Sequence, residues 1–354
     1  MIQNIKMSLT LDEALEVIDK INYKTEKETI HIDNALNRVL AEDISSAENV
    51  PPFRRSSLDG YAIKSQDTIG VTEENPIKLD IIEEVPAGNV PLLSVKSGQC
   101  TKILTGAPVP DGADAVIRYE DVTFDSQNIS LGINVKENAN VAPIGEVIKK
   151  GELLSQEGDI ITPSVGAVLS SVGVSKVSVY KKAKVALIST GSEVVSVDDE
   201  LPKGKIRNSS HFMIKGYVEN INAEVNYLGI CKDDTDSISK KISEGLKDND
   251  IVITTGGVSV GDYDLVKDAV LALGGEIVFW KVKLQPGSTF LLAKVNGKYV
   301  VGLSGNPGSA YITFQLIAIP LIKKIMGMSD YRLEKITVKL MEPLCKKRSI
   351  TQYI

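Results

Sequence analysis

The segment 251–265 constrains the fold more than any other part of the sequence. It reads Ile-Val-Ile-Thr-Thr-Gly-Gly-Val-Ser-Val-Gly-Asp-Tyr-Asp-Leu, which predicts an apolar strand, then a glycine loop, then a helix with Asp262 and Asp264 in its first turn. Glycines let the loop bring backbone N–H groups close to an anion, and the helix N-terminus adds partial positive charge. Two carboxylates beside such a loop suggest a divalent cation between protein and phosphate. Alternatively, Asp262 is a helix N-cap and the glycines only shape a turn.

Length and composition exclude several classes of protein. A chain of 354 residues predicts two or three domains. Lys and Arg total 40 against 46 Asp and Glu, so the net charge of -6 gives no general attraction for nucleic acid. The three cysteines lie far apart and there are only two histidines, which argues against a zinc site, a disulfide framework or a histidine-rich metal centre. No signal segment begins the sequence, and the apolar run 310–322 is too short to span a bilayer, so we expect a cytoplasmic protein without membrane contact.

The pattern along the chain changes three times. Thr10 and Glu13 form a capping box before a helical pattern that begins near Leu11. Between 47 and 143 short β-branched runs alternate with Pro and Gly, which predicts a β-rich domain. An apolar helix at 163–172 follows, and we expect the segment 146–180 to pack with the N-terminal helix. The β-rich part would then be an insertion into a helical domain.

From Lys184 onward strands and helices alternate, which predicts a three-layer α/β domain with a mainly parallel sheet. The expected strands are 185–189, 224–229 and 251–254, and the expected helices are 209–219, 235–246 and 263–273. Asn296-Gly297 predicts a hairpin between 290–295 and 298–303. Ligands of such sheets bind beyond the carboxyl ends of the strands, where the loops 190–193, 255–261 and 304–307 would lie.

Acidic and basic residues on or near these loops are candidates for ligand binding. Glu193 and Asp233 follow successive strands and could hold Mg²⁺ or position a water molecule, although each could equally be a solvated carboxylate or a helix cap. Lys281 and Lys283 are candidates for binding a phosphorylated ligand. The segment Ser304-Gly305-Asn306-Pro307 could contribute to the same site or be a plain turn before a helix.

Six segments, in one order over residues 8–345, resemble molybdopterin molybdenumtransferase, the MoeA family that includes the E domain of gephyrin. They are Pro51-Pro-Phe-Arg-Arg-Ser-Ser-Leu-Asp-Gly-Tyr-Ala62, Thr105-Gly-Ala-Pro-Val-Pro-Asp-Gly-Ala-Asp114, Ser189-Thr-Gly-Ser-Glu193, Gly204-Lys-Ile-Arg-Asn-Ser209, Thr255-Gly-Gly-Val-Ser-Val-Gly261 and Gly305-Asn-Pro307. One such segment alone would be weak, whereas six in sequence are specific.

The resemblance implies a multidomain α/β fold. It comprises an elongated helical domain (1–46 plus 144–181), an inserted β-rich domain (47–143), an α/β molybdopterin-binding-like domain (182–328) and a C-terminal β-barrel. Because the sequence ends at Ile354, we expect only the start of the barrel (329–354).

The resemblance also implies a homodimer that takes adenylylated molybdopterin, cleaves the adenylate with Mg²⁺ and molybdate, and inserts the metal into the dithiolene. The molybdopterin adenylyltransferase is a further possible partner.

The site residues carried over by motif come from two domains, and the family's site lies between the β-rich domain of one subunit and the α/β domain of the other. Asp59 and Thr105 would come from the β-rich side as catalytic residues, with Glu193 and Asp233 from the α/β side. Glu193, Asp233, Asp262 and Asp264 would be the metal ligands. The remaining substrate-binding residues would be Gly256, Gly257, Ser259, Gly261, Ser304, Gly305, Asn306, Pro307, Lys281 and Lys283.

Four departures from the family pattern bear on the anion side of the site. Ser304 replaces a proline, Gln285 and Ser288 replace basic residues, and Arg54 replaces an acidic residue; the fourth is the early end of the sequence. These changes leave open a catalytically weakened molybdopterin-binding scaffold, and they leave open tungstate in place of molybdate. A molybdopterin adenylyltransferase is a weaker alternative, because such proteins lack the Asp-Gly-Tyr-Ala and Thr-Gly-Ala-Pro segments.

Overall fold

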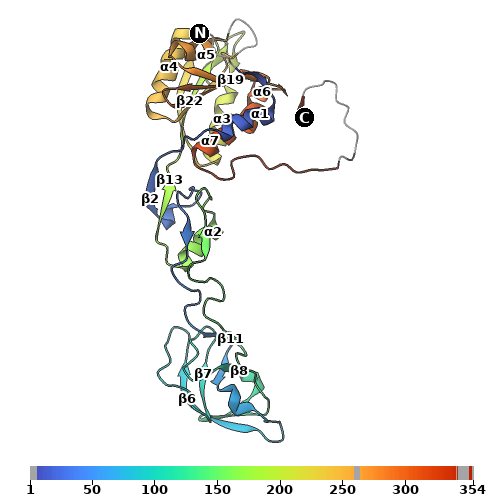
Figure 1. Cartoon of the computed structure of the whole chain (residues 1–354). Coiled ribbons are helices and arrows are strands. Elements are labelled where there is room, and N and C mark those ends of the chain that lie inside the picture. The colour runs from blue at the N-terminus through green and yellow to red at the C-terminus, as the bar shows by residue number, and fades with distance from the viewer. Residues whose placement is uncertain (1–5, 259–263, 340, 342–350, 353–354) are drawn as a thin grey trace. The chain divides into compact units, whose positions relative to one another are not determined.

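The computed structural model describes residues 6–258, 264–339, 341 and 351–352. It divides into two compact units (Figure 1), and each is described by itself. The α/β unit comprises Met1–Asp43, Gln156–Gly166 and Ser175–Ile354, and the β-rich unit comprises Ile44–Ser155 and Ala167–Val174. Helix α2 (Pro163–Ser171) contains residues of both.

A seven-stranded sheet forms the middle layer of the α/β unit, in the order β1-β19-β21-β22-β18-β14-β17. Every neighbouring pair is parallel except the two pairs that include β21, so six strands end at one edge of the sheet. The strands are β1 (Lys6–Leu9), β14 (Lys184–Thr190), β17 (Glu224–Cys231), β18 (Ile251–Thr255), β19 (Glu276–Val282), β21 (Phe290–Val295) and β22 (Lys298–Leu303).

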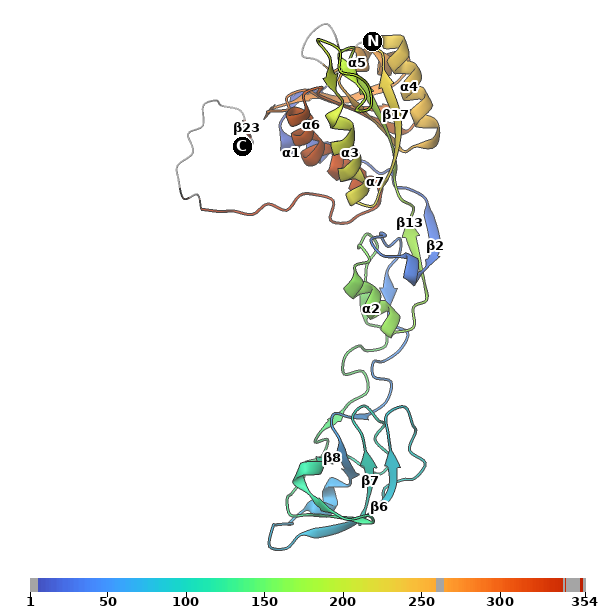
Figure 2. The same ribbon diagram turned by 180° about the vertical axis from the view of Figure 1, so that it is seen from behind.

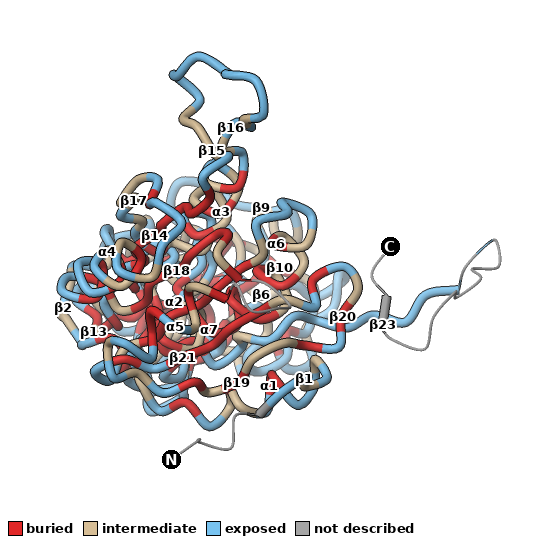
Figure 3. Tube along the Cα trace, turned by 90° about the horizontal axis from the view of Figure 1, so that it is seen from above, coloured by how far each residue is buried: buried red, intermediate tan, exposed pale blue. Residues whose placement is uncertain are grey.

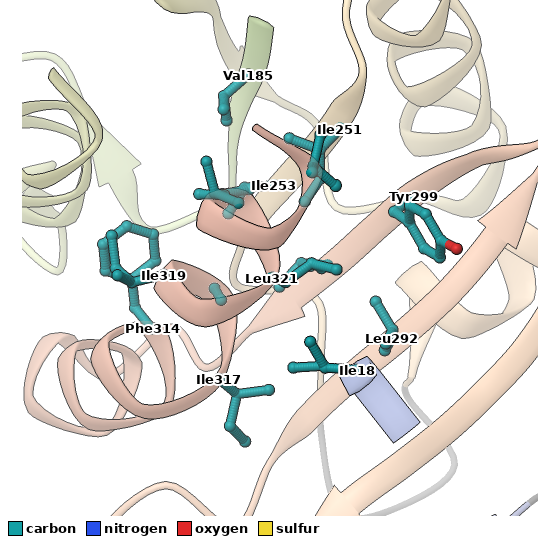
Figure 4. Close-up of a cluster of buried hydrophobic side chains, with 14 of the residues drawn as sticks. Ile18, Val185, Ile251, Ile253, Leu292, Tyr299, Phe314, Ile317, Ile319 and Leu321 are labelled. Carbon is teal, nitrogen blue, oxygen red and sulfur yellow. The ribbon is translucent and has the colours of Figure 1, made fainter. Parts of the chain in front are cut away.

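Helices cover both faces of this sheet, as Figures 1 and 2 show from opposite sides. One face carries α1 (Leu11–Asp19), α3 (Ser209–Asn220), α6 (Pro307–Thr313), the π-helix η4 (Phe314–Ala318) and α7 (Ile319–Ile325), and the other carries α4 (Thr235–Asp248) and α5 (Leu265–Ala272). Each face has its own buried apolar cluster; Figure 4 shows Ile253, Phe314 and Leu321 in the first of them. Because both faces are covered, every residue of β18 is buried, as expected for a central parallel strand.

The capping box at Thr10 forms as predicted and begins α1 at Leu11. The predicted packing of this helix against 146–180 is wrong. Strand β1 instead pairs with β19, and α1 contacts α7, η4 and β19, with Ala14, Leu15 and Ile18 buried in the core of the α/β unit. The apolar face of α1 buries more apolar surface against the sheet than it could against a short helix.

The other strands of the α/β unit form short pairs outside the sheet. Strands β2 (Lys27–His31) and β13 (Lys176–Tyr180) pair antiparallel, and a 3-10 turn, η1 (Ile32–Asn34), follows β2. Strand β15 (Val194–Val195) pairs with β16 (Ile206–Arg207), and β20 (Leu284–Gln285) pairs with β23 (Thr351–Gln352). Figure 3 shows an exposed excursion of the chain between β15 and β16.

A six-stranded sheet in the order β8-β5-β7-β6-β10-β9 organises the β-rich unit, with apolar clusters on both faces. Gly60 permits the close pairing of β5 with β8, because a Cβ there would lie 1.9 Å from the carbonyl oxygen of Ile117. The elements of this unit are β3 (Ile44–Ser45), β4 (Arg55–Ser56), β5 (Gly60–Ile63), η2 (Ser65–Thr68), β6 (Ile77–Val85), β7 (Gln99–Ile103), β8 (Ala115–Arg118), η3 (Tyr119–Asp121), β9 (Thr123–Phe124), β10 (Asn128–Leu131), β11 (Val141–Ala142) and β12 (Leu153–Ser155).

The predicted α/β alternation is confirmed, including the hairpin of β21 and β22. The helix predicted from 263 is described from Leu265, so Asp264 is its N-cap and does not lie in the first turn. The four-domain division of the chain, with its boundaries at 46, 143, 181 and 328, stays a prediction. No helix within the described residues has the length and apolar character needed to cross a membrane.

Candidate functional site

A small polar cavity lies at the carboxyl edge of the seven-stranded sheet. Its volume is about 40 Å³, and its lining comes from the ends of β14 and β18, the turn after β22, and the start of α3. The lining residues are Ser189, Thr190, Glu193, Val194, Ile206, Arg207, Asn208, Ser209, Ser210, Thr255, Gly305 and Pro307. Parallel strands bring their carboxyl ends together, so the three predicted loops contribute to one place, as expected for a sheet of this kind.

Asn208 connects three elements beside this cavity. Its Nδ2 donates to Ser189 Oγ at 2.8 Å and to the Tyr227 hydroxyl at 3.0 Å. Its Oδ1 accepts from the backbone N–H of His211 at 3.2 Å and thereby caps α3. The hydroxyl of Thr255 lies 3.3 Å from that of Ser189. The side chains at the ends of β14 and β18 are thus connected to the start of α3.

Thr190 supplies a buried hydroxyl with no hydrogen-bond partner among the described residues. The residue is 3% exposed. Its Oγ1 faces the glycine loop, because a Cβ on Gly256 would lie 2.8 Å from this oxygen and one on Gly257 would lie 3.0 Å from it. Both glycines have positive φ, at 91° and 66°. The loop therefore needs glycine for its conformation and for its close approach to β14.

Glu193 and Asp233 lie close enough to interact electrostatically. Partial burial raises the pKa of Asp233, and the negative charges of Glu193 and Asp234 raise it further. Both carboxylate oxygens of Glu193 would lie 2.9 Å from a Cβ on Gly191, so this glycine lets the carboxylate fold back over the loop. Asp234 itself caps α4 by accepting from Ser237 N at 2.7 Å.

Asp264 is buried, with 1% of its surface exposed. Its Oδ1 accepts from Lys267 N at 3.3 Å, whereas Oδ2 has no partner among the described residues. Burial raises the pKa of Asp264, and the Lys267 N–H and charge oppose this effect. No group of three or more His, Cys, Asp or Glu in the described part of the chain is placed to hold a metal ion.

Two of the basic residues of the α/β unit, Arg207 and Lys281, are engaged in contacts. Arg207 Nη1 donates to the carbonyl oxygens of Ser196, Val197 and Asp199 at 3.1, 2.7 and 2.8 Å, and so fixes the excursion between β15 and β16. Lys281 Nζ lies 4.2 Å from the ring centroid of Trp280. Lys283 follows β19 with an exposed side chain.

The turn after β22 reaches the glycine loop. A Cβ on Gly305 would lie 3.5 Å from Cα of Gly256. Asn306 caps α6 by accepting from Ser309 N at 3.1 Å, and Pro307 is the first residue of the helix. Ser304 Oγ accepts from Asn306 N at 3.2 Å, so the serine at this position stabilises the turn.

In the β-rich unit, hydrogen bonds orient the carboxylate of Asp59. Asp59 precedes β5 and Thr105 follows β7, and Asp59 Oδ1 accepts from the Thr105 backbone N–H at 2.6 Å and from its hydroxyl at 2.7 Å. These two hydrogen bonds lower the pKa of Asp59, which is exposed. Arg54 donates to the carbonyl oxygen of Ala113 at 3.1 Å.

Comparisons with known proteins cover both units. The family description "MoeA N-terminal region (domain I and II)" matches residues 9–173, and "Probable molybdopterin binding domain" matches residues 186–324. Molybdopterin molybdenumtransferase of Staphylococcus epidermidis strain RP62A is 36% identical over 346 residues, which is 98% of this chain and 83% of that protein. The enzyme of the same name from Staphylococcus aureus strain COL is 38% identical over 326 residues, or 92% of this chain and 78% of that protein.

The chain belongs to the molybdopterin molybdenumtransferase family. It is a transferase of molybdenum cofactor biosynthesis. Its fold agrees with that of the crystallised molybdopterin biosynthesis MoeA protein from Pyrococcus horikoshii OT3, with a TM-score of 0.79 at 35% identity over 92% of this chain and 81% of the other.

The molybdenumtransferase motifs fall into two groups. Asp59 and Thr105 lie in the region matched by the MoeA N-terminal description, and they contact each other. Glu193, Gly305 and Pro307 line the cavity, with Gly256 and Gly257 next to its Thr190 wall. Ser259, Gly261 and Asp262 lie outside the described residues. Whether the predicted residues bind or catalyse stays a prediction.

Sequence reasoning missed several residues of the cavity as functional candidates, chiefly Ser189, Thr190, Asn208 and Thr255. Each belongs to a quoted family segment, but sequence spacing does not show that a side chain in 204–209 reaches the ends of β14 and β18. The sequence did contain a signal for Asn208. An Asn directly before a helical pattern predicts a helix N-cap, whose side chain is held in place by the hydrogen bond that it accepts from the first turn.

Proposed function

We propose that this molybdenumtransferase inserts molybdate into adenylylated molybdopterin in a Mg²⁺-dependent reaction that releases AMP, and that it acts as a homodimer. The observation that carries the proposal is the convergence of the Glu193 loop, the glycine loop and the Gly305 turn around one polar cavity. An adenylylated substrate brings a phosphoanhydride and a dithiolene, so the protein mainly needs donors for oxyanions and carboxylates for a cation.

Glu193 and Asp233 fit a hard cation. Partial burial raises the pKa of Asp233, repulsion from Glu193 raises it further, and a nearby cation would relieve that repulsion. When bound, Mg²⁺ would neutralise phosphate charge as the bond to AMP breaks. The carboxylates of the chain would orient the cation and the attacking group. The Thr190 hydroxyl and the backbone of Gly256 and Gly257 would meet the substrate's oxygens.

Asp59 would act from the β-rich unit of the other subunit. Its two hydrogen bonds from Thr105 keep the carboxylate ionised and hold it in one orientation. Each unit by itself offers part of the proposed constellation, which supports a site completed by dimerisation. Sedimentation of an active monomer at micromolar concentration would contradict this part of the proposal.

The decisive experiment is a turnover assay with purified protein. Incubation with adenylylated molybdopterin, Mg²⁺ and molybdate should release AMP and yield a cofactor that activates an apo molybdoenzyme. Tungstate is assayed in parallel, because Gln285 and Ser288 leave the choice of metal open. Binding of the nucleotide without AMP release that depends on Mg²⁺ and molybdate would defeat the proposal and favour a molybdopterin-binding scaffold.

A further inference from the structure

The orientation of the Asn208 amide is determined by its surroundings. A backbone N–H can donate only to an acceptor, so the atom facing His211 N must be the amide oxygen. The amide nitrogen then faces Ser189 Oγ and the Tyr227 hydroxyl, and both of these oxygens must accept. Asn208 is therefore a donor toward the cavity wall.

The protons of Ser189 and Thr255 can be counted from this arrangement. The two hydroxyls lie 3.3 Å apart and hold two protons, one of which serves the bond between them. Because Ser189 Oγ already accepts from Asn208, the second proton is left to donate elsewhere. Neither hydroxyl has another acceptor among the described residues, and both residues line the cavity.

Two further features point to the same kind of ligand. Thr190 lines the same cavity, and its hydroxyl, which faces the glycine loop, is buried and has no partner in the described part of the chain. Ser209 and Ser210 open α3, and the first N–H groups of a helix lack intrahelical partners. A cavity of about 40 Å³ has room for a small group such as an oxyanion oxygen.

We infer that Asn208 is a positioning residue that orients the Ser189–Thr255 hydroxyl pair so that its one free proton is donated to an oxyanion oxygen held in this cavity. Asn208 acts through these hydroxyls and does not itself touch the oxyanion. The inference builds on the proposed function, which supplies two oxyanions: the phosphate that leaves as AMP, and molybdate. Both offer oxygens that accept from hydroxyl donors, so the cavity chemistry suits either.

The test compares Asn208→Ser, Ser189→Ala and the double variant by calorimetric titration. The first titration uses AMP in the presence of Mg²⁺, and the second uses molybdate alone. Serine retains the helix cap but cannot donate to both Ser189 and Tyr227. Each single variant should weaken binding of one oxyanion by about 10- to 150-fold, the loss expected for one oriented hydrogen bond to a charged group. The double variant should bind no more weakly than Ser189→Ala, because Asn208 acts through Ser189.

The matched control is Asn222→Ser at the other end of α3, where the amide donates to the carbonyl oxygen of Asn37 at 2.9 Å. It should leave both affinities unchanged. A loss confined to AMP identifies the substrate phosphate as the occupant, and a loss confined to molybdate identifies the metal oxyanion. Wild-type affinities in folded Ser189→Ala, or losses that add in the double variant, would overturn the inference.

These outcomes are separable from the fate of the proposed function. The titrations need no turnover, so a protein that binds AMP without releasing it from the substrate would defeat the transferase mechanism and leave this inference standing. If Asn208→Ser should lower the melting temperature too far for titration, Asn208→Asp replaces it in the single and double variants, because an Asp side chain retains the cap of α3 and cannot donate to Ser189 when ionised.

Discussion

The candidate site residues of the two units present their polar groups in opposite ways. In the α/β unit, Thr190 Oγ1 and Asp264 Oδ2 are buried without partners among the described residues, and the pKa values of Asp233 and Asp264 are raised. In the β-rich unit, Asp59 is exposed, satisfied by Thr105, and its pKa is lowered. Unsatisfied buried groups are costly, and the presence of one, Thr190, in a residue that lines the cavity is typical of a site built to receive a ligand.

The difference indicates a division of work. The α/β unit would bind, because its free donors and crowded carboxylates gain most when an oxyanion and a cation arrive. The β-rich unit would contribute the charge of Asp59, whose orientation is already set and which needs no rearrangement at the moment of reaction.

The largest expected effect comes from removing that charge. Asp59→Asn should lower turnover by about 10²-fold or more while leaving the melting temperature nearly unchanged, since the exposed side chain adds little to the core. Its matched control is Asp67→Asn in the same unit, where the carboxylate likewise accepts from a hydroxyl and a backbone N–H, those of Ser97 and Gly98, at 2.8 and 2.9 Å. Steady-state kinetics and thermal unfolding of both variants check this prediction. Equal losses of activity in the two would remove any special role of Asp59.

The same test applied to the α/β unit uses Glu193→Gln. If this carboxylate holds Mg²⁺, turnover should fall by a similar factor, of order 10², and added Mg²⁺ should partly restore it. Titration of the rate with Mg²⁺ measures this. The turnover of Asp59→Asn should not rise with added Mg²⁺. The same Mg²⁺ dependence in both variants would contradict the proposal that the two units have different roles.

A second comparison concerns the space available for a Cβ atom at two glycines, Gly256 in the glycine loop and Gly204. Gly256→Ala should destabilise the fold by about 2–3 kcal/mol, because the residue has positive φ and its Cβ would lie 2.4 Å from the Thr190 carbonyl oxygen. Gly204→Ala also has positive φ but meets nothing within 4 Å, so it should cost only about 1 kcal/mol. Denaturant unfolding distinguishes the two. Equal costs would mean that the loop yields readily and is not held against β14.

The sequence predicted the elements of the α/β unit well because each strand is followed by a turn and by a helix with apolar periodicity. It failed for α1, since helical periodicity shows an apolar face without showing which surface covers it. The pairing of β1 with β19 joins residues far apart in the chain, and no local pattern carries that information.

For the site, Asp59 and Thr105 were found because both belong to family motifs, yet their hydrogen bond depends on the pairing of β5 with β7. The cavity network around Asn208 was missed for the same reason. It depends on the register of three elements, and single polar residues such as Ser189 and Thr255 resemble ordinary strand ends in the sequence.

Asp264 gives a smaller and pH-dependent effect. Burial raises its folded pKa, so the stability gained from its protonated form is present below the unfolded pKa, about 3.9, and is lost as pH rises through the folded pKa. The Asp264→Asn variant keeps the helix cap. Because its amide does not ionise, it also removes the loss of stability that accompanies rising pH. The variant should therefore be more stable than wild type at pH 7, on the order of 1 kcal/mol, with the difference vanishing near pH 3. Unfolding is measured with a chelator present, so that bound cations do not mask the effect. A variant less stable at pH 7 would show that the ionised carboxylate is satisfied in the folded protein.

The smallest expected effect concerns the anion side, where the family pattern has a basic residue and this chain has Ser288. Ser288 is exposed, between β20 and β21. A lysine introduced there would be screened by water, so its interaction with molybdate should resemble that of an exposed ion pair, about 0.2–1 kcal/mol. Ser288→Lys should accordingly improve molybdate affinity by no more than about fivefold at low ionic strength, and the gain should disappear as salt screens the charge. AMP affinity serves as the internal control, because the family resemblance assigns this position to the metal-oxyanion side of the site. A gain in AMP affinity and none in molybdate affinity would instead place the phosphate near Ser288, and the assignment of binding groups within the α/β unit would have to be reversed.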